Sequence, residues 1–255
     1  WQEKTFSSDI SPTNPNDIII IDYEVAAKLG DKKLVDDNMA LGSQVEIGEF
    51  TLQKVKDQFF YVAPLNHSGF WKWRRNKNGT PGYMIVNANN DKDVRLVSNV
   101  NGVDIKLKYQ MGACFGDYLP RHLYQNGYKT IGLGDYSFEI DDDMMPWYVV
   151  TKYEKKIGYF GNDATGVILV NPMNGDIKEY SINDAPIWID RIQPKNFITS
   201  QINSWGIYVH GIWNFSGRDK RKLSEGVQLV YGNDGICYLY SGVTSTGSDN
   251  ASMGF

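Results

Sequence analysis

The sequence predicts a β-rich α+β fold, made of repeated antiparallel β units with a few short helices. Three observations support this prediction. Aromatic residues make up 13% of the 255 residues, and flat rings pack well on the pleated surface of a sheet. Apolar and polar residues alternate between Val45 and Val55, which is the period of two typical of strands. A long pattern of residues also occurs twice along the chain, the sequence signature of a repeated structural unit.

The repeat runs from Tyr61 to Val97 in one copy and from Tyr148 to Ile182 in the other. We predict a third copy that starts near Tyr238 and stops at Phe255, so we expect another apolar strand to follow in the natural chain. The alternative is that aromatic-rich β-hairpins resemble one another by composition. Both full copies begin with Tyr-Val and share three further landmarks: Gly69-Phe70 and Gly158-Tyr159, Gly82-Tyr83 and Gly166-Val167, and Val86-Asn87 and Val170-Asn171.

The repeat suggests a division of the chain into three parts. Residues 1–17 are polar with two prolines and are expected to form an extended arm or linker. Residues 18–143 would form a first β-rich unit with an N-terminal helix. Residues 144–255 would form a second β-rich unit with a helix and the truncated third copy.

Helix and turn signals place further elements within these parts. A helix over 24–30 should end at Gly30, since glycine is the common residue just past a helix end. Pro194 suits the first turn of a helix within 190–210. In chain order we predict helical segments at 24–30, 32–39, 119–124 and 190–210, and strands at 45–55, 57–65, 69–75, 82–88, 91–97 and 136–140.

An acidic run is the strongest polar cluster. Glu139, Asp141, Asp142 and Asp143 supply the carboxylate oxygens that calcium prefers, so the run is a candidate metal site, although it lacks the spacing of an EF-hand. Paired carboxylates also serve as acid and base in glycoside hydrolysis. The alternative is a solvated turn between two strands.

A second candidate site combines aromatic and basic residues. Trp71 and Trp73 alternate with Lys72 and Arg74, and Arg75 follows. On a strand both indoles would share one face. If that face is exposed, Trp71, Trp73, Arg74 and Arg75 would bind a partner, a sugar or a membrane surface; the alternative is that the indoles pack in the core.

Motifs for common chemistries are missing from the sequence. It contains no GxSxG elbow, no phosphate-binding loop and no zinc-type spacing of cysteine and histidine. We therefore expect no cofactor and assign no catalytic residue, which leaves enzymatic activity an open question. The two cysteines, Cys114 and Cys237, would pair if the protein is exported, or would be buried as small apolar residues.

The stretch Leu169 to Asp176, LVNPMNGD, resembles the end of PepSY-type units. The stretches FEIDDDMMPWYVV (138–150) and DAPIWIDRIQP (184–194) resemble large extracytoplasmic segments of uncharacterised bacterial membrane proteins. These resemblances imply a location on the extracytoplasmic side of the cell membrane, with the membrane tether outside residues 1–255. They imply no catalytic residues.

The leading hypothesis is therefore a non-enzymatic extracytoplasmic or surface domain of a larger membrane-anchored protein, with a binding or scaffolding role. Its partner would be a protein or a cell-envelope component. Nucleic acid is not expected, because the net charge is −4 and nucleic-acid binders show a basic surface. The alternatives are a cell-wall or polysaccharide hydrolase that uses carboxylates near Asp141–Asp143, and a structural assembly protein of a phage or secretion machine.

Overall fold

The structure, a computed structural model, describes residues 19–37, 39–157, 160–189, 194–211, 213, 217–224, 228–231, 237–246 and 252–254. The predicted arm at 1–17 lies outside these residues. The chain divides into two compact units, a larger one of residues 19–197 and a smaller one that contains residues 198–255. Within the described residues the fold is β-rich with several antiparallel sheets and a few short helices, which confirms the predicted fold class.

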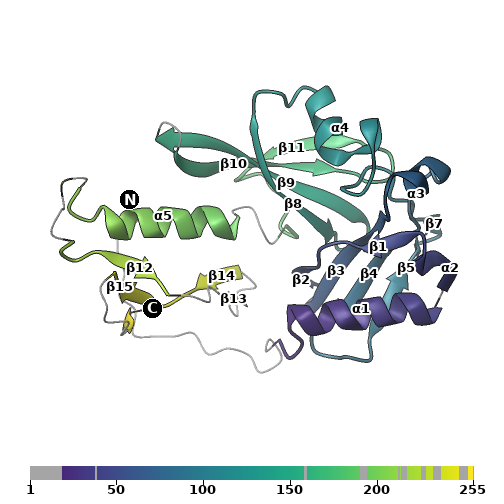
Figure 1. The fold of residues 1–255 in the computed structure, drawn as a ribbon, viewed down its shortest axis with the longest axis horizontal. Helices are drawn as coiled ribbons and strands as arrows, with labels where there is room; N and C mark the ends of the chain where they lie inside the picture. The colour runs from purple at the N-terminus through teal and green to yellow at the C-terminus, as the bar shows by residue number, and fades with distance from the viewer. Residues whose placement is uncertain are drawn as a thin grey trace. The chain divides into compact units, whose positions relative to one another are not determined.

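Two antiparallel meanders of four strands form most of the larger unit (Figure 1). In each meander the strands pair in sequence order, and each pair is antiparallel. A fifth strand, β1 (Val45–Ile47), pairs with the far end of β3 in the first meander. The first meander contains β2 (Thr51–Val55), β3 (Gln58–His67), β4 (Tyr83–Asn87) and β5 (Val94–Val97); the second contains β8 (Gly132–Ile140), β9 (Pro146–Ile157), β10 (Phe160–Val170) and β11 (Ile177–Ser181).

The sequence repeat corresponds to these two meanders at the landmarks that the structure describes in both copies. The landmark Gly69-Phe70 begins α3, and its counterpart Gly158-Tyr159 lies outside the described residues. The Tyr-Val landmark opens the pairing of the second strand with the third: Tyr61 lies opposite Val86, and Tyr148 lies opposite Val170. The same valines, Val86 and Val170, then face Val94 and Ile177 on the fourth strands. The predicted repeat of antiparallel β units is therefore confirmed in strand order and in register.

The glycine landmark has the same structural cause in both copies. A Cβ atom on Gly82 would overlap the carbonyl oxygen of Val97, and one on Gly166 would overlap that of Tyr180. Gly82 also has a φ of +87°, a conformation that side chains disfavour. Both glycines let the third strand approach the fourth closely.

The asparagine landmark closes each copy with the same turn. The Asn87 side-chain oxygen accepts the backbone N–H of Asn89 at 2.9 Å, and the Asn171 oxygen accepts that of Met173 at 2.9 Å. Such bonds to the backbone two residues on are the reason that asparagine is common in turns. The PepSY-like stretch Leu169–Asp176 is this turn together with the end of β10.

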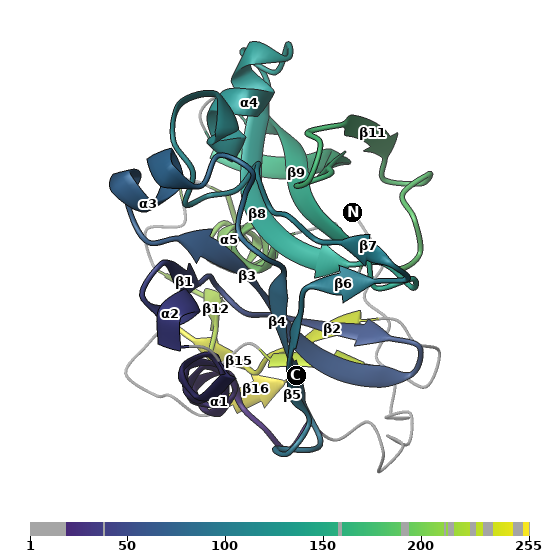
Figure 2. The ribbon, with the colours of Figure 1, turned by 90° about the vertical axis from the view of Figure 1, so that its right-hand side faces the viewer.

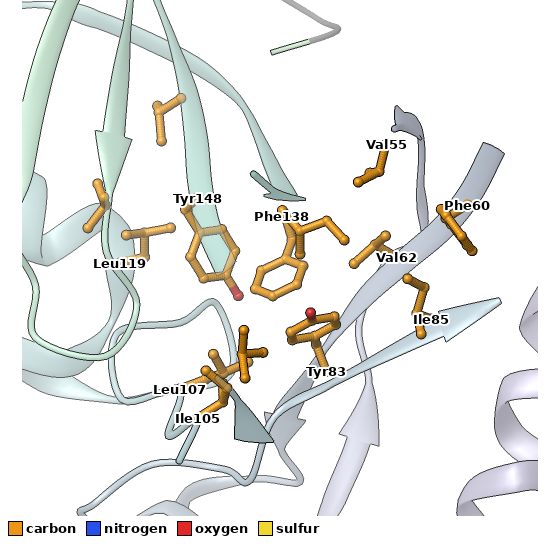
Figure 3. Close-up of a cluster of buried hydrophobic side chains, with 14 of the residues drawn as sticks. Val55, Phe60, Val62, Tyr83, Ile85, Ile105, Leu107, Leu119, Phe138 and Tyr148 are labelled. Carbon is orange, nitrogen blue, oxygen red and sulfur yellow. The ribbon is translucent and has the colours of Figure 1, made fainter. Parts of the chain in front are cut away.

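The two meanders share one hydrophobic core. Figure 3 shows the rings of Tyr83, Phe138 and Tyr148 meeting at its centre. The Phe138 ring centroid lies 5.8 Å from that of Tyr83 and 5.3 Å from that of Tyr148. The predicted division at residues 143 and 144 falls in the turn between β8 and β9, inside this larger unit.

A buried glutamine joins the meanders by hydrogen bonds. The Gln53 side chain is fully buried. Its amide donates to the carbonyl of Ile140 and accepts the N–H of Ile140, both at 2.8 Å. The Gln53 side chain thus makes the same pair of hydrogen bonds to Ile140 of β8 that the backbone of a neighbouring strand would make. Gln53 and Glu139 hold the same register position in the two copies, opposite Phe60 and Trp147.

The helices differ from prediction at two places. Helix α1 (Tyr23–Asp37) runs through Gly30 without a break, because glycine there serves packing: a Cβ atom would lie 2.8 Å from the Phe50 ring. The segment predicted as a strand at 69–75 is instead the helix α3 (Phe70–Arg75). The remaining short elements of the larger unit are α2 (Met39–Gly42), β6 (Asn99–Val100), β7 (Val103–Asp104), the 3-10 turn η2 (Phe115–Asp117) and α4 (Leu119–Gln125).

The other predicted helices are confirmed. Helix α4 has Pro120 in its first turn, and α5 (Lys195–Ile207) follows Pro194. Within the smaller unit, the N–H of Leu223 donates to the Asn203 side chain at 2.8 Å, which ties α5 to the first of its strands.

The smaller unit also contains two small sheets. The strands β12 (Arg221–Leu223), β15 (Val243–Ser245) and β16 (Ser252–Gly254) form one, and β13 (Gln228–Tyr231) with β14 (Cys237–Tyr240) forms the other. The predicted third copy would begin in β14 and stays a prediction.

Candidate functional site

Helix α3 lies at the margin of the larger unit, beyond the end of β3 (Figure 2). Gly69 starts it with a φ of +88°, and the Trp73 N–H donates to the Gly69 carbonyl. Asn76 ends it: its backbone N–H bonds back to the helix, and its side-chain amide donates to the Gly79 carbonyl at 2.9 Å. These local bonds favour one short helical turn over a strand.

The helix separates the two tryptophans that were predicted to share a face. Residues two apart on a helix point in different directions, whereas on a strand they point the same way. Trp73 is only 4% exposed, while Trp71 is 67% exposed. The prediction of one common Trp face is therefore wrong, and the two rings have different roles.

Trp73 anchors α3 to the body of the larger unit. Its indole N–H donates to Asp117 Oδ2 at 3.1 Å, as a buried indole requires. The Lys77 ammonium lies 3.4 Å from the centroid of the Trp73 ring, a cation–π contact. Asp117 also lies 3.9 Å from the Lys108 ammonium, so its charge is used within the fold.

Three exposed rings surround this buried anchor. Phe70 is 38% exposed, Trp71 67% and Phe115 60%. Phe70 bridges the group, with ring centroids 5.2 Å from Trp71, 5.8 Å from Trp73 and 6.3 Å from Phe115. We call Phe70, Trp71 and Phe115, together with the cations Lys72, Arg74, Arg75 and Lys77, the α3 patch.

Phe115 was missed by the sequence analysis, and no motif marks it. Its φ is +55°, which is costly for a bulky residue. The loop that carries it is held by a buried polar network: Gln110 donates to Thr80 Oγ1 at 2.9 Å and accepts the His67 N–H at 2.9 Å. The fold thus maintains a strained backbone while the ring stays in solvent.

Three cations of the patch have no ion-pair partner within the part of the chain that the structure describes. Among the residues that the structure describes, no carboxylate forms an ion pair with Lys72, Arg74 or Arg75. Arg74 and Arg75 are both exposed. The predicted binding residues Arg74 and Arg75 therefore lie beside the exposed rings, where their charges are available to a partner.

The acidic run is a structured turn. Asp141 Oδ1 accepts the N–H groups of Asp143 and Met145 at 3.0 and 2.9 Å, and its Oδ2 accepts the Trp147 indole N–H at 3.0 Å. Glu139 is fully buried and accepts the Ser137 hydroxyl at 2.7 Å, while Asp142 and Asp143 are exposed. In the described part of the chain no three acidic, histidine or cysteine residues form a group that could hold a metal.

Asp143 does line a cavity of about 620 Å³ at the end of the first meander. Lys56, Arg95, Asn99 and Asn101 also line it. Arg95 forms an ion pair with Asp93 at 2.8 Å, so one of the two cations that line the cavity already has a partner. The cavity therefore provides no grouped set of acid and base.

The three histidines are each engaged by contacts within the fold. His67 is 2% exposed, and burial holds the pKa of its imidazole below the usual value, although Asp117 opposes this effect. His122 Nε2 lies 2.8 Å from the Gly175 carbonyl, and its ring contacts that of Tyr109 in a tilted arrangement, with the centroids 4.4 Å apart. His210 pairs with Asp219 at 2.8 Å. Cys114 is a free thiol.

No protein-family model, no curated protein and no solved structure matches this chain. Within its described part, none of the helices has the length and apolar character needed to cross a membrane.

Proposed function

We propose that this chain is a non-catalytic binding domain of a larger membrane-anchored bacterial protein. It would lie on the extracytoplasmic side and contact a cell-envelope component through the α3 patch. The observation that carries the proposal is a set of three exposed aromatic rings next to four cations. Exposed apolar patches of this kind mark interaction sites, and tryptophan and arginine are enriched among the residues that dominate binding energy.

The exposed rings contribute little to folding, which supports a role in binding. Trp71 keeps two thirds of its surface in water, so the hydrophobic effect gains little from it. Phe115 has a backbone conformation that costs about 1–3 kcal/mol, while its ring is 60% exposed. A partner that covers both rings would gain the hydrophobic free energy of burying them, which folding alone does not provide.

A sedimentation assay tests the proposal. The chain is mixed with purified peptidoglycan sacculi or with isolated bacterial membranes, and the bound fraction is measured. We expect binding to at least one of these materials and a loss of at least tenfold for Trp71→Ala/Phe115→Ala. Trp213→Ala is the matched control, since Trp213 is an 81% exposed tryptophan of the smaller unit.

Urea unfolding of the same variants excludes loss of structure as the cause. Surface substitutions usually change the free energy of unfolding by no more than about 0.5 kcal/mol, and we expect this for Trp71→Ala/Phe115→Ala. Absence of binding to either material, or equal binding by the double variant, would refute the proposal.

A further inference from the structure

We infer that the α3 patch docks on the surface of a membrane rich in anionic phospholipid. This inference rests on the proposed function and specifies what the patch contacts. It follows from the chemistry of the rings, the local charge and the place of α3 in the fold.

The aromatic rings suit the interfacial zone of a bilayer. Tryptophan is enriched at the level of the lipid headgroups because its ring is apolar and its N–H is polar. The rings of Trp71 and Phe115 both contact the ring of Phe70. Trp71 lies on the short helix α3 at the margin of the larger unit (Figure 2), and Phe115 lies in the turn η2. The buried Trp73 anchors this helix to the body of the larger unit, so the exposed rings are already in position before the protein contacts a membrane.

The local charge of the patch favours contact with an anionic surface. Lys72, Arg74, Arg75 and Lys77 place four positive charges within six residues. The whole chain has a net charge of −4, so the residues outside the patch together carry −8. An anionic membrane would attract this patch, with each cation contributing about fivefold to affinity.

The arginines favour diffuse headgroup charge over one fixed carboxylate partner. Bidentate recognition of a carboxylate needs a guanidinium held in one orientation. No ion pair within the described residues holds Arg74 or Arg75. Arginine side chains without such a partner can adjust their orientation to mobile lipid headgroups. An acidic peptide of fixed shape does not require this freedom.

Vesicle sedimentation with the whole chain tests the inference. The probes are vesicles of phosphatidylglycerol and phosphatidylcholine in equal parts and vesicles of pure phosphatidylcholine. We expect binding to the anionic vesicles, at least tenfold weaker binding to the neutral ones, and weakening when salt rises from 0.1 to 0.5 M, because salt screens exposed charges.

Two pairs of variants separate the patch from overall charge. Arg74→Glu/Arg75→Glu should lower the affinity for anionic vesicles by about thirtyfold or more, since two cations are lost. Lys28→Glu/Lys32→Glu makes the same change in net charge at exposed residues of α1 and should weaken binding less than threefold. Trp71→Ala/Phe115→Ala should also lose binding, whereas Trp213→Ala should not.

The outcomes separate this inference from the proposed function. Equal binding to neutral and anionic vesicles, or equal loss with the α1 variants, would overturn the inference. Binding to sacculi, or to a protease-sensitive component of native membranes, without binding to vesicles would also overturn it, the latter in favour of an acidic protein, while the proposed function would stand. Absence of binding to every envelope material and vesicle would overturn both.

Discussion

The two meanders of the larger unit have the same strand order and matching register at their landmarks, and they differ most in the connection between the second and third strands. In the second copy, β9 ends at Ile157, β10 begins at Phe160, and these two residues pair directly. In the first copy, β3 and β4 are joined by residues 68–82, which contain α3. A tight hairpin is therefore sufficient for this meander. Helix α3 is an addition to the repeat, and it carries most of the patch.

The second difference lies where the copies meet. Gln53 and Glu139 are both fully buried at equivalent register positions. Gln53 reaches across to the backbone of Ile140, whereas Glu139 accepts a hydroxyl from Ser137 on its own strand. The register positions that both copies share define the meander. The residue at such a position decides whether the side chain bonds to the other copy, as Gln53 does, or within its own copy, as Glu139 does.

The largest effect should come from the glycines shared by both copies. We expect Gly82→Ala to lower the free energy of unfolding by about 3–5 kcal/mol, because the new Cβ overlaps the Val97 carbonyl and φ is positive. Gly166→Ala should cost about 2–3 kcal/mol, since it adds overlap without positive φ. Urea unfolding measures both.

Gly102→Ala is the control for backbone strain alone. Gly102 has a φ of +83°, but a Cβ atom there would meet no atom within 4 Å. It should cost about 1 kcal/mol. Equal costs at Gly82, Gly166 and Gly102 would show that the close approach of the third and fourth strands is not what these glycines provide.

Next comes the glutamine that joins the copies. Gln53→Met keeps the size of the side chain but leaves the buried N–H and carbonyl of Ile140 without their partner, so we expect a loss of about 2–4 kcal/mol. The exposed Gln125→Met should be near neutral. A Gln53→Met protein as stable as the original would mean that the hydrogen bonds of Gln53 do not join the copies.

The turn asparagines should have smaller and matched effects. Asn87→Ala and Asn171→Ala each remove one hydrogen bond of 2.9 Å to the backbone, so each should cost about 1 kcal/mol. Asn78→Ala, at an exposed position, should cost less. Costs that differ between the two turns by more than about 1 kcal/mol would contradict their equivalence.

The smallest effect should come from pH. Burial lowers the pKa of His67, so the folded protein takes up this proton at a lower pH than the unfolded chain does, near 6.5. Stability should therefore be fully present above about pH 6.5 and decline below it until the pH reaches the folded pKa. His67→Gln should flatten the decline in unfolding free energy measured between pH 7 and 5; an unchanged slope would exclude His67 as its source.

Much of the meander could be predicted from the sequence because its landmarks are local. Tyr-Val, the glycine where the third strand approaches the fourth and Val-Asn each occupy a position that backbone geometry restricts, so they recur in both copies. Gly30 was misjudged because the same residue serves a second purpose, close packing against Phe50 inside a helix.

The candidate site could be predicted only in part. Aromatic and basic residues alternate from Trp71 to Arg74, which fits a strand, but the segment forms a helix that depends on caps from Gly69 and Asn76. Trp71 was named as a candidate from the sequence, but its exposure follows from that helix. Phe115 reaches the patch only through tertiary contacts with Trp73 and Phe70, which no local pattern records.

Hydrogen–deuterium exchange with and without anionic vesicles tests the central claim most directly, because it compares the differing connections of the two copies in one sample. We expect slower exchange of amides in residues 70–77 and 113–118 when vesicles are present, and unchanged exchange in the hairpin of β9 and β10. Protection of that hairpin, or of neither segment although the protein binds, would contradict the claim that the addition to the first copy is the binding site.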